Sequence, residues 1–329
     1  MLIAQSVVLS ALALSVSGAP LRTPDWHSQT TKAAPSGRWA PQMTYDAGHN
    51  ESVLFGGISA SKLGPQSNAD TWVWQGEAWT QLFPAASPPA RESGKLVYDA
   101  ARNNCVLFGG NNFIDDGIEF TFGDTWVWDG VNWTQRFPEI SPGQRYGFAM
   151  AYDQVHGVVV LFGGTDGVNF LNDTWTWNGT NWTQQFPASK PSPRFQPSLT
   201  YDGANRQTVL LGGAGPGGIL SDTWVWDGSD WTEKVSPVMP SPRYGALLEY
   251  DASETQVILF GGEDSSGTLA DTWSWNGQLW SPASPRIVPK GRFYPGEAYD
   301  SSTGQIVMFG GGFGTAHGNI YLDDSWLWY

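Results

Sequence analysis

The sequence predicts an all-β protein folded as a six-bladed β-propeller, with four antiparallel strands in each blade. An Asp-Thr/Ser-Trp-x-Trp unit recurs six times, and so does a Gly-Gly pair that follows an apolar run. Each repeat opens with an arginine, and Tyr-Asp follows seven residues later. Self-similarity at a period of about 50 residues indicates a repeat architecture, and short strands with regular turns are typical of propeller blades. The six arginines are Arg38, Arg91, Arg145, Arg194, Arg243 and Arg292.

Each repeat contains the pattern of four short strands. In the first repeat, strand one runs from Arg38 to Asp46, strand two ends at Gly56-Gly57, strand three is segment 70–74 and strand four begins at Trp79. Runs of β-branched and aromatic residues between Gly, Asn and Pro turns indicate hairpins. A glycine lies between strands three and four of the repeats, where a tight turn needs a left-handed residue. Four antiparallel strands therefore form one blade.

The two ends of the chain predict how the ring closes. The tryptophan of each fourth strand precedes the next arginine by 12 residues, and Trp26 precedes Arg38 by the same 12. The sequence ends at Ser325-Trp326-Leu327-Trp328-Tyr329, which matches a third strand. We therefore expect the segment around Trp26 to supply the fourth strand of the last blade. This arrangement hides strand edges that would otherwise favour aggregation.

Composition supports a large aromatic core and excludes some partners. Of the 19 tryptophans, 18 occupy the repeat pattern, so we assign them to packing. Lys and Arg total 17 against 31 Asp and Glu, a formal charge of -14, which disfavours nucleic acid as a partner. The single cysteine, Cys105, allows no intramolecular disulfide, and with four scattered histidines it leaves no zinc-type spacing. We expect no metal and no cofactor.

The N-terminus resembles a secretory signal. No residue from 1 to 21 is charged, residues 7–14 are mostly apolar, and Ser17, Gly18 and Ala19 are small enough for cleavage. The interpretation divides the chain into a signal at 1–19 and one propeller at 20–329, with a secreted, periplasmic or extracellular protein as the product. An uncleaved anchor is the alternative, although Gln5 and several serines make the segment poorly apolar. No other segment suggests a transmembrane helix.

These motifs resemble those of the kelch family of β-propellers, in the galactose oxidase superfamily. The resemblance covers Trp26 to Tyr329 and rests on Gly-Gly, Tyr-Asp, Trp-x-Trp and Pro-x-x-Arg at fixed spacing. It implies the fold but no single activity, because kelch propellers include copper oxidases, sialate epimerases, plant specifier proteins and binding modules. The copper site of the oxidases needs two histidines, two tyrosines and a cysteine. Here the histidines are dispersed and Cys105 opens a second strand, so we reject a copper site.

The repeated residues are expected to serve the fold. Six equivalent arginines are better explained by six equivalent blade junctions than by one asymmetric ligand. Departures from the repeat are more informative, and the loops between strands two and three are extended at 58–69, 111–123 and 312–323. Asp115, Asp116 and Glu119 lack the ordered oxygen spacing of a calcium loop, so we expect a solvated acidic loop there.

A polar pocket is predicted near blades five and six. Glu297 occupies a position that is Met or Leu in the other five repeats, where it needs a partner such as Arg292 or a cavity. Alternate positions of the inner strands are expected to face the channel, among them Gln42, Lys95, Gln196, Glu249 and Tyr294. Glu249, Glu297, Tyr294 and Arg292 could then bind a sugar or act as acid and base. A water-filled channel is the alternative.

The sequence leaves two functions open. A deep pocket beside Glu249 or Glu297 would favour a sugar-active enzyme, similar to the sialate epimerase or mutarotase group. An open aromatic rim would favour an exported, monomeric module that binds carbohydrate or protein on the arginine-bearing face, and this is the preferred interpretation. The rim would contain Trp39, Tyr146, Phe195, Tyr244 and Phe293.

Overall fold

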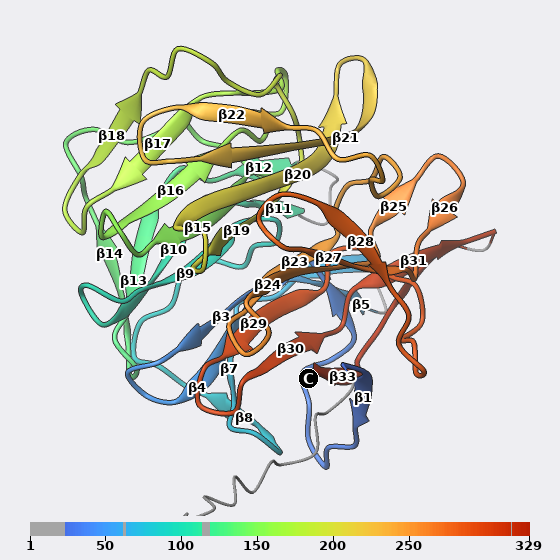
Figure 1. Ribbon diagram of the computed structural model, residues 1–329. Helices are drawn as coiled ribbons and strands as arrows, with labels where there is room; N and C mark the ends of the chain where they lie inside the picture. Colours follow the sequence, from blue (N-terminus) through green and yellow to red (C-terminus); the bar gives the residue numbers. More distant parts are fainter. Residues whose placement is uncertain (1–23, 62–63, 114–118, 317) are drawn as a thin grey trace, which may run out of the picture.

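The computed structural model describes residues 24–61, 64–113, 119–316 and 318–329. Within these ranges the chain forms six four-stranded antiparallel sheets arranged as the blades of a propeller (Figure 1). Each blade contains an inner strand beside the channel, two middle strands and an outer strand. The predicted six-bladed all-β fold is confirmed. No helix in the described ranges is long and apolar enough to span a membrane.

The strands repeat with nearly constant length. The inner strands are β3 (Gln42–Asp46), β9 (Lys95–Asp99), β15 (Ala149–Asp153), β19 (Ser198–Asp202), β23 (Leu247–Asp251) and β29 (Gly296–Asp300). The second strands are β4 (Glu51–Phe55), β10 (Asn104–Phe108), β16 (Val158–Phe162), β20 (Gln207–Gly215), β24 (Gln256–Phe260) and β30 (Gln305–Phe309). The third strands are β7 (Thr71–Trp74), β13 (Thr125–Trp128), β17 (Thr174–Trp177), β21 (Gly218–Trp226), β27 (Thr272–Trp275) and β33 (Ser325–Trp328). The outer strands are β8 (Trp79–Leu82), β14 (Trp133–Arg136), β18 (Trp182–Gln185), β22 (Trp231–Lys234), β28 (Trp280–Ala283) and β1 (Trp26–Gln29).

The ring closes between the two ends of the chain. Strand β1 pairs antiparallel with β33, with Trp26 opposite Trp328 and Gln29 opposite Ser325. Figure 1 shows β1 in blue beside β33 in red. The twelve-residue spacing between Trp26 and Arg38 therefore predicted the closing strand correctly. One blade is built from both termini, so unfolding either end opens the ring.

Neighbouring blades are joined by a hydrogen bond that explains the Thr or Ser in Asp-Thr/Ser-Trp. The outer-strand tryptophan of each blade donates its indole N–H to the hydroxyl of the preceding blade's motif. Trp133, for example, donates to Thr71 over 3.0 Å, and Trp26 donates to Thr272 over 3.2 Å. Both rings are almost fully buried and shielded from water, so without these bonds the indole N–H groups would have no hydrogen-bond partner.

Strand one starts later than the sequence analysis predicts. The inner strands begin four residues after each arginine, and in the first repeat Arg38–Trp39 forms the separate strand β2. The residue two positions after each arginine has a positive φ, between 47° and 63°, which turns the chain before the strand begins. Strand periodicity cannot continue through a left-handed residue. These six residues are Ala40, Ser93, Gly147, Gln196, Gly245 and Tyr294.

The three extended loops between strands two and three, and the shorter loop of blade 5, form hairpins on the face that carries the arginines, hereafter the arginine face. They are β5 (Ile58–Ser61) with β6 (Gly64–Ser67), β11 (Asn111–Phe113) with β12 (Glu119–Thr121), β25 (Glu263–Asp264) with β26 (Gly267–Thr268), and β31 (Gly312–Thr315) with β32 (Gly318–Tyr321). The turns after Tyr-Asp lie at the opposite end of the inner strands, hereafter the tyrosine face. Asp115 and Asp116 lie outside the described residues.

Candidate functional site

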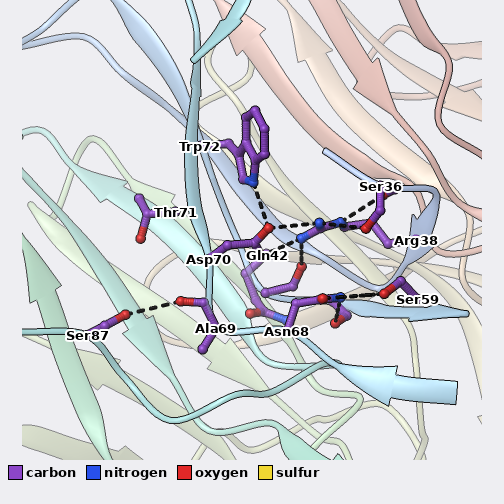
Figure 2. A network of polar contacts seen from close by, with 12 residues as sticks. Ser36, Arg38, Gln42, Ser59, Asn68, Ala69, Asp70, Thr71, Trp72 and Ser87 are labelled. Atoms are coloured by element: carbon purple, nitrogen blue, oxygen red, sulfur yellow. Dashed lines mark hydrogen bonds and ion pairs between the residues drawn. The ribbon is translucent and has the colours of Figure 1, made fainter. Parts of the chain in front are cut away.

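The repeated arginines tie each blade together internally. Arg38 makes two hydrogen bonds to the carboxylate of Asp70, at 2.6 and 2.9 Å, and donates to the carbonyl oxygen of Gly56 at 2.7 Å. Trp72 donates its indole N–H to the same carboxylate at 2.7 Å, as Figure 2 shows. Arg38 is 1% exposed, so its guanidinium group bonds to protein groups rather than to solvent or a ligand. The network joins the start of a blade to its third strand.

Arg292 belongs to this structural set. It bonds both oxygens of Asp324 at 2.6 and 2.8 Å, donates to Gly310 O, and is fully buried. Burial opposes ionisation of Asp324, but the hydrogen bonds and charge of Arg292 outweigh it and lower the pKa of that carboxyl group. The other five arginines form equivalent pairs. Glu297 therefore does not meet Arg292, the partner that the sequence analysis named for it.

A closed circle of backbone hydrogen bonds surrounds the channel at the arginine face. It consists of the six left-handed residues, one from each blade, and we call it the mouth ring. Each backbone N–H in the ring donates to the carbonyl oxygen of its counterpart in the preceding blade. The donor–acceptor pairs are Ala40 to Tyr294, Ser93 to Ala40, Gly147 to Ser93, Gln196 to Gly147, Gly245 to Gln196 and Tyr294 to Gly245.

Two side chains of the mouth ring extend over its neighbouring residues. The hydroxyl of Tyr294 donates to Oε1 of Gln196, across the intervening blade. A Cβ atom at Gly245 would overlap the ring of Tyr294, so glycine is required there both for its φ of 63° and for space. The structure therefore brings together Tyr294 and Gln196, two of the predicted site residues, at the mouth of the channel.

Five aromatic rings form a continuous cluster beside the mouth ring, hereafter the aromatic platform. Trp39 lies 5.1 Å from Phe293, 6.3 Å from Tyr294 and 5.0 Å from Tyr321 between ring centroids, and Tyr244 lies 6.1 Å from Tyr294. Phe293 is buried, while the other four are partly exposed. The platform thus presents aromatic surface on a packed base.

Acidic groups border the platform. Burial raises the pKa of Tyr244 to about 12, and the adjacent Glu263 contributes through its charge and a hydrogen bond. Glu92 replaces an aromatic residue at the equivalent position of blade 2, where it is buried and accepts from the Asn111 amide at 3.4 Å. Tyr146 lies away from the platform and contacts Phe195 at 5.6 Å. The predicted rim is therefore divided into a larger and a smaller aromatic group.

The channel contains a cavity on the other side of the mouth ring. Its main part has a volume of ≈ 300 Å³ and extends to exposed residues of the tyrosine face, such as Ala47 and Gln154. A smaller part of ≈ 50 Å³ lies within the mouth ring, where Tyr294 and Gln196 line it. Lys95 and Glu297 line both parts. These two side chains therefore border both the narrow space and the wider one.

Three ionisable side chains meet at this level of the channel. Lys95 Nζ lies 3.8 Å from Glu297 Oε1, and the two side chains are 38% and 17% exposed. Glu249 accepts from the Thr200 hydroxyl at 3.0 Å. Burial raises the pKa of Glu297 to about 7, although the charge of Lys95 opposes the shift. Burial also raises the pKa of Glu249.

The inner strands place the five aliphatic counterparts of Glu297 in the core, as expected. The same five residues and Glu297 also line the main cavity. The aliphatic members are also buried, so the channel wall is the inner edge of the core. A carboxylate at this position consequently meets a cavity. The five counterparts are Met43, Leu96, Met150, Leu199 and Leu248.

Comparison with solved structures agrees with this architecture. The structure of YjhT, a kelch-repeat propeller protein, superposes with a TM-score of 0.67 over 89% of this chain and 95% of its own, at 14% sequence identity. The protein has the fold of a kelch propeller. No family model matches the sequence, and no curated protein matches it in sequence. At this level of identity the likeness supports the fold alone.

Several features of this propeller could not be found from its sequence. Only glycine at two of the six equivalent positions hints at the mouth ring in the sequence. The other four positions carry non-glycine residues in a left-handed conformation, which the sequence does not reveal. Tyr321 was missed because it comes from a hairpin of irregular length. Cys105 is fully buried, as a small core residue would be. In the described ranges, no three His, Cys, Asp or Glu side chains converge as a metal site would require.

Glu297 should make the stability of the propeller depend on pH. The pKa of Glu297 is raised in the folded state, so the folded protein holds a proton that the unfolded chain releases between about pH 4.5 and 7. That contribution is present at lower pH and is lost as the pH rises through 7. Between about pH 4 and about pH 8, the free-energy difference between Glu297→Leu and the wild type should shift in favour of the variant by about 3 kcal/mol.

Urea unfolding at several pH values measures this shift. Glu77→Leu, on an exposed turn, is the control and should show no comparable shift. A constant difference between Glu297→Leu and the wild type over this pH range would mean that the pKa of Glu297 is close to its ordinary value.

Proposed function

We propose that the protein is an exported, monomeric binding module that takes a neutral carbohydrate on the aromatic platform. The observation that carries the proposal is a cluster of four partly exposed aromatic rings in mutual contact on the arginine face. They belong to Trp39, Tyr244, Tyr294 and Tyr321. The flat rings offer apolar surface to the C–H face of a sugar. The tyrosine hydroxyls and the nearby carboxylate of Glu263 offer hydrogen bonds to sugar hydroxyls.

Charge selects among carbohydrates. The chain has a formal charge of -14, and the repeated arginines of this face form ion pairs with aspartates of their own blades. An acidic glycan would meet the carboxylate of Glu263, while the six repeated arginines of the described chain are each paired with an aspartate. Electrostatic repulsion of like charges disfavours that complex. Neutral sugars avoid this cost, so they are the preferred class.

The shape of the channel supports binding on the face over catalysis inside it. The space within the mouth ring, ≈ 50 Å³, is far below the roughly 300–1,000 Å³ typical of small-molecule sites. Glu249 and Glu297 line the main cavity, which reaches the tyrosine face. The mouth ring therefore lies between the platform and Glu249, and of the two carboxylates only Glu297 also lines the small space within the ring. This arrangement favours a binding module over the sugar-active alternative.

Replacing Trp39 with alanine should weaken glycan binding about 30-fold, because truncating a central aromatic anchor costs about 2 kcal/mol or more. A thermal-shift screen of neutral and acidic oligosaccharides first identifies a ligand, and calorimetry then compares the variants. Phe137→Ala is the matched control, since Phe137 is 83% exposed and follows outer strand β14, outside the platform.

The control should bind like the wild type. Equal affinities for Trp39→Ala and the wild type would place the sugar elsewhere. A screen in which acidic glycans bind more tightly than neutral ones would contradict the preferred class. If no glycan in the screen binds but a protein ligand binds through Trp39, the platform is a protein-binding surface and the carbohydrate proposal fails.

A further inference from the structure

The main cavity has polar features that the proposed function does not use. It lies on the other side of the mouth ring from the aromatic platform and reaches the tyrosine face. Its inner end carries Lys95, Glu249 and Glu297, contributed by three different blades. The remaining wall at the level of Glu297 is aliphatic. The cavity therefore combines opposite charges at one end with apolar surface around them.

The charged groups retain bonding capacity toward the cavity. The distance of 3.8 Å between Lys95 Nζ and Glu297 Oε1 is too long for a hydrogen bond. The two groups therefore attract each other electrostatically but do not share a hydrogen bond. Glu249, by contrast, is held in place by the Thr200 hydroxyl at 3.0 Å. A ligand that enters this end meets a fixed carboxylate, a second carboxylate and an ammonium group. Partly buried charges that retain hydrogen-bonding capacity favour a ligand that supplies partners for them.

We propose that this cavity binds a small zwitterion of the apolar α-amino acid class. The carboxylate of the ligand bonds to Lys95, and its ammonium group lies between Glu249 and Glu297. The apolar side chain packs against the opposite wall, where Met150 and Leu199 lie. The volume of ≈ 300 Å³ is at the lower end of small-ligand sites, which suits a molecule of this size and excludes an oligosaccharide.

The pattern of charges decides between this ligand and simpler ones. An organic cation would satisfy the two carboxylates but would bring a second positive charge beside Lys95. An organic anion would pair with Lys95 but would face Glu249 and Glu297. A zwitterion pairs with both signs at once, and each charged hydrogen bond contributes enough to change affinity at least tenfold.

Calorimetry with three probes tests the proposal on the intact protein. L-Leucine carries both charges, N-acetyl-L-leucine lacks the ammonium group, and 3-methylbutylamine lacks the carboxylate. We expect L-leucine to bind, and each analogue to bind at least tenfold more weakly. Lys95→Met and Glu297→Gln should each weaken L-leucine binding at least tenfold. Trp39→Ala should leave L-leucine binding unchanged, because Trp39 lies on the arginine face.

Absence of L-leucine binding at millimolar concentration would overturn the proposal, and so would equal binding of all three probes. Glu297→Leu supplies a further variant, since it restores the aliphatic residue found in the other blades and should fold well. Retention of L-leucine binding in Glu297→Leu would also overturn the assignment. The test is independent of the carbohydrate proposal, which concerns the platform and is measured with Trp39→Ala and glycans.

Discussion

Replacing Arg292 with leucine should lower the free energy of unfolding by about 3–5 kcal/mol. The guanidinium group is fully buried and bonds both oxygens of Asp324 and the carbonyl oxygen of Gly310. Leucine would leave a half-buried carboxylate and a buried carbonyl group without these partners. Removing one member of a buried charged pair costs more than the pair itself contributes, because the remaining charge stays desolvated.

Urea denaturation of matched variants measures this loss. Arg145→Leu should cost about as much as Arg292→Leu, because Arg145 makes the same bonds to Asp173. Arg136→Leu is the control for an exposed arginine, at the end of β14, and should cost about 1 kcal/mol or less. If Arg292→Leu were fully stable but failed to bind ligand, the arginine would belong to the binding site and its structural assignment would be wrong.

Replacing Trp26 with alanine should also cost about 3–5 kcal/mol, because it leaves a large cavity in the closing blade. Trp26 is fully buried, packs at 5.0 Å from Phe260 and 5.3 Å from Trp328, and donates to Thr272. Its loss weakens both the junction with blade 5 and the pairing of β1 with β33. The free energy of unfolding should therefore fall although Trp26 lies at the edge of the described chain.

The equivalent change in an internal blade calibrates this prediction. Trp182 is buried in the same way and donates to Thr125 at 3.0 Å, so Trp182→Ala should be destabilised to a similar extent. A Trp26→Ala variant close to wild-type stability, beside a strongly destabilised Trp182→Ala, would show that the first strand does not close the ring.

The fold could be predicted because its determinants repeat. Each motif occurs six times, so the same strand pattern is predicted six times independently. Trp26 has the spacing of a fourth-strand tryptophan but no third strand before it, and it can therefore belong only to the closing strand. The roles of Thr71 and its counterparts could not be predicted in this way, since each of these bonds between blades links residues at least 57 positions apart. Spacing within one repeat carries no information about such contacts.

The candidate site could be predicted only in part. The sequence analysis singled out Glu297, Lys95 and Tyr294, and the structure places all three around the space within the mouth ring. The left-handed residue two positions after each arginine could not be predicted, and it delays the start of the inner strand. Tyr321 reached the platform from a hairpin whose course depends on loop length rather than on strand periodicity. Loops of this kind are placed by tertiary contacts.

A crystal structure with the tightest-binding neutral oligosaccharide tests the account most directly. Electron density for a sugar ring over Trp39 and Tyr294 on the arginine face, with the mouth ring intact beneath it, is the predicted result. Density for the sugar inside the main cavity beside Glu297, or away from the aromatic platform altogether, would contradict the assignment of the binding face.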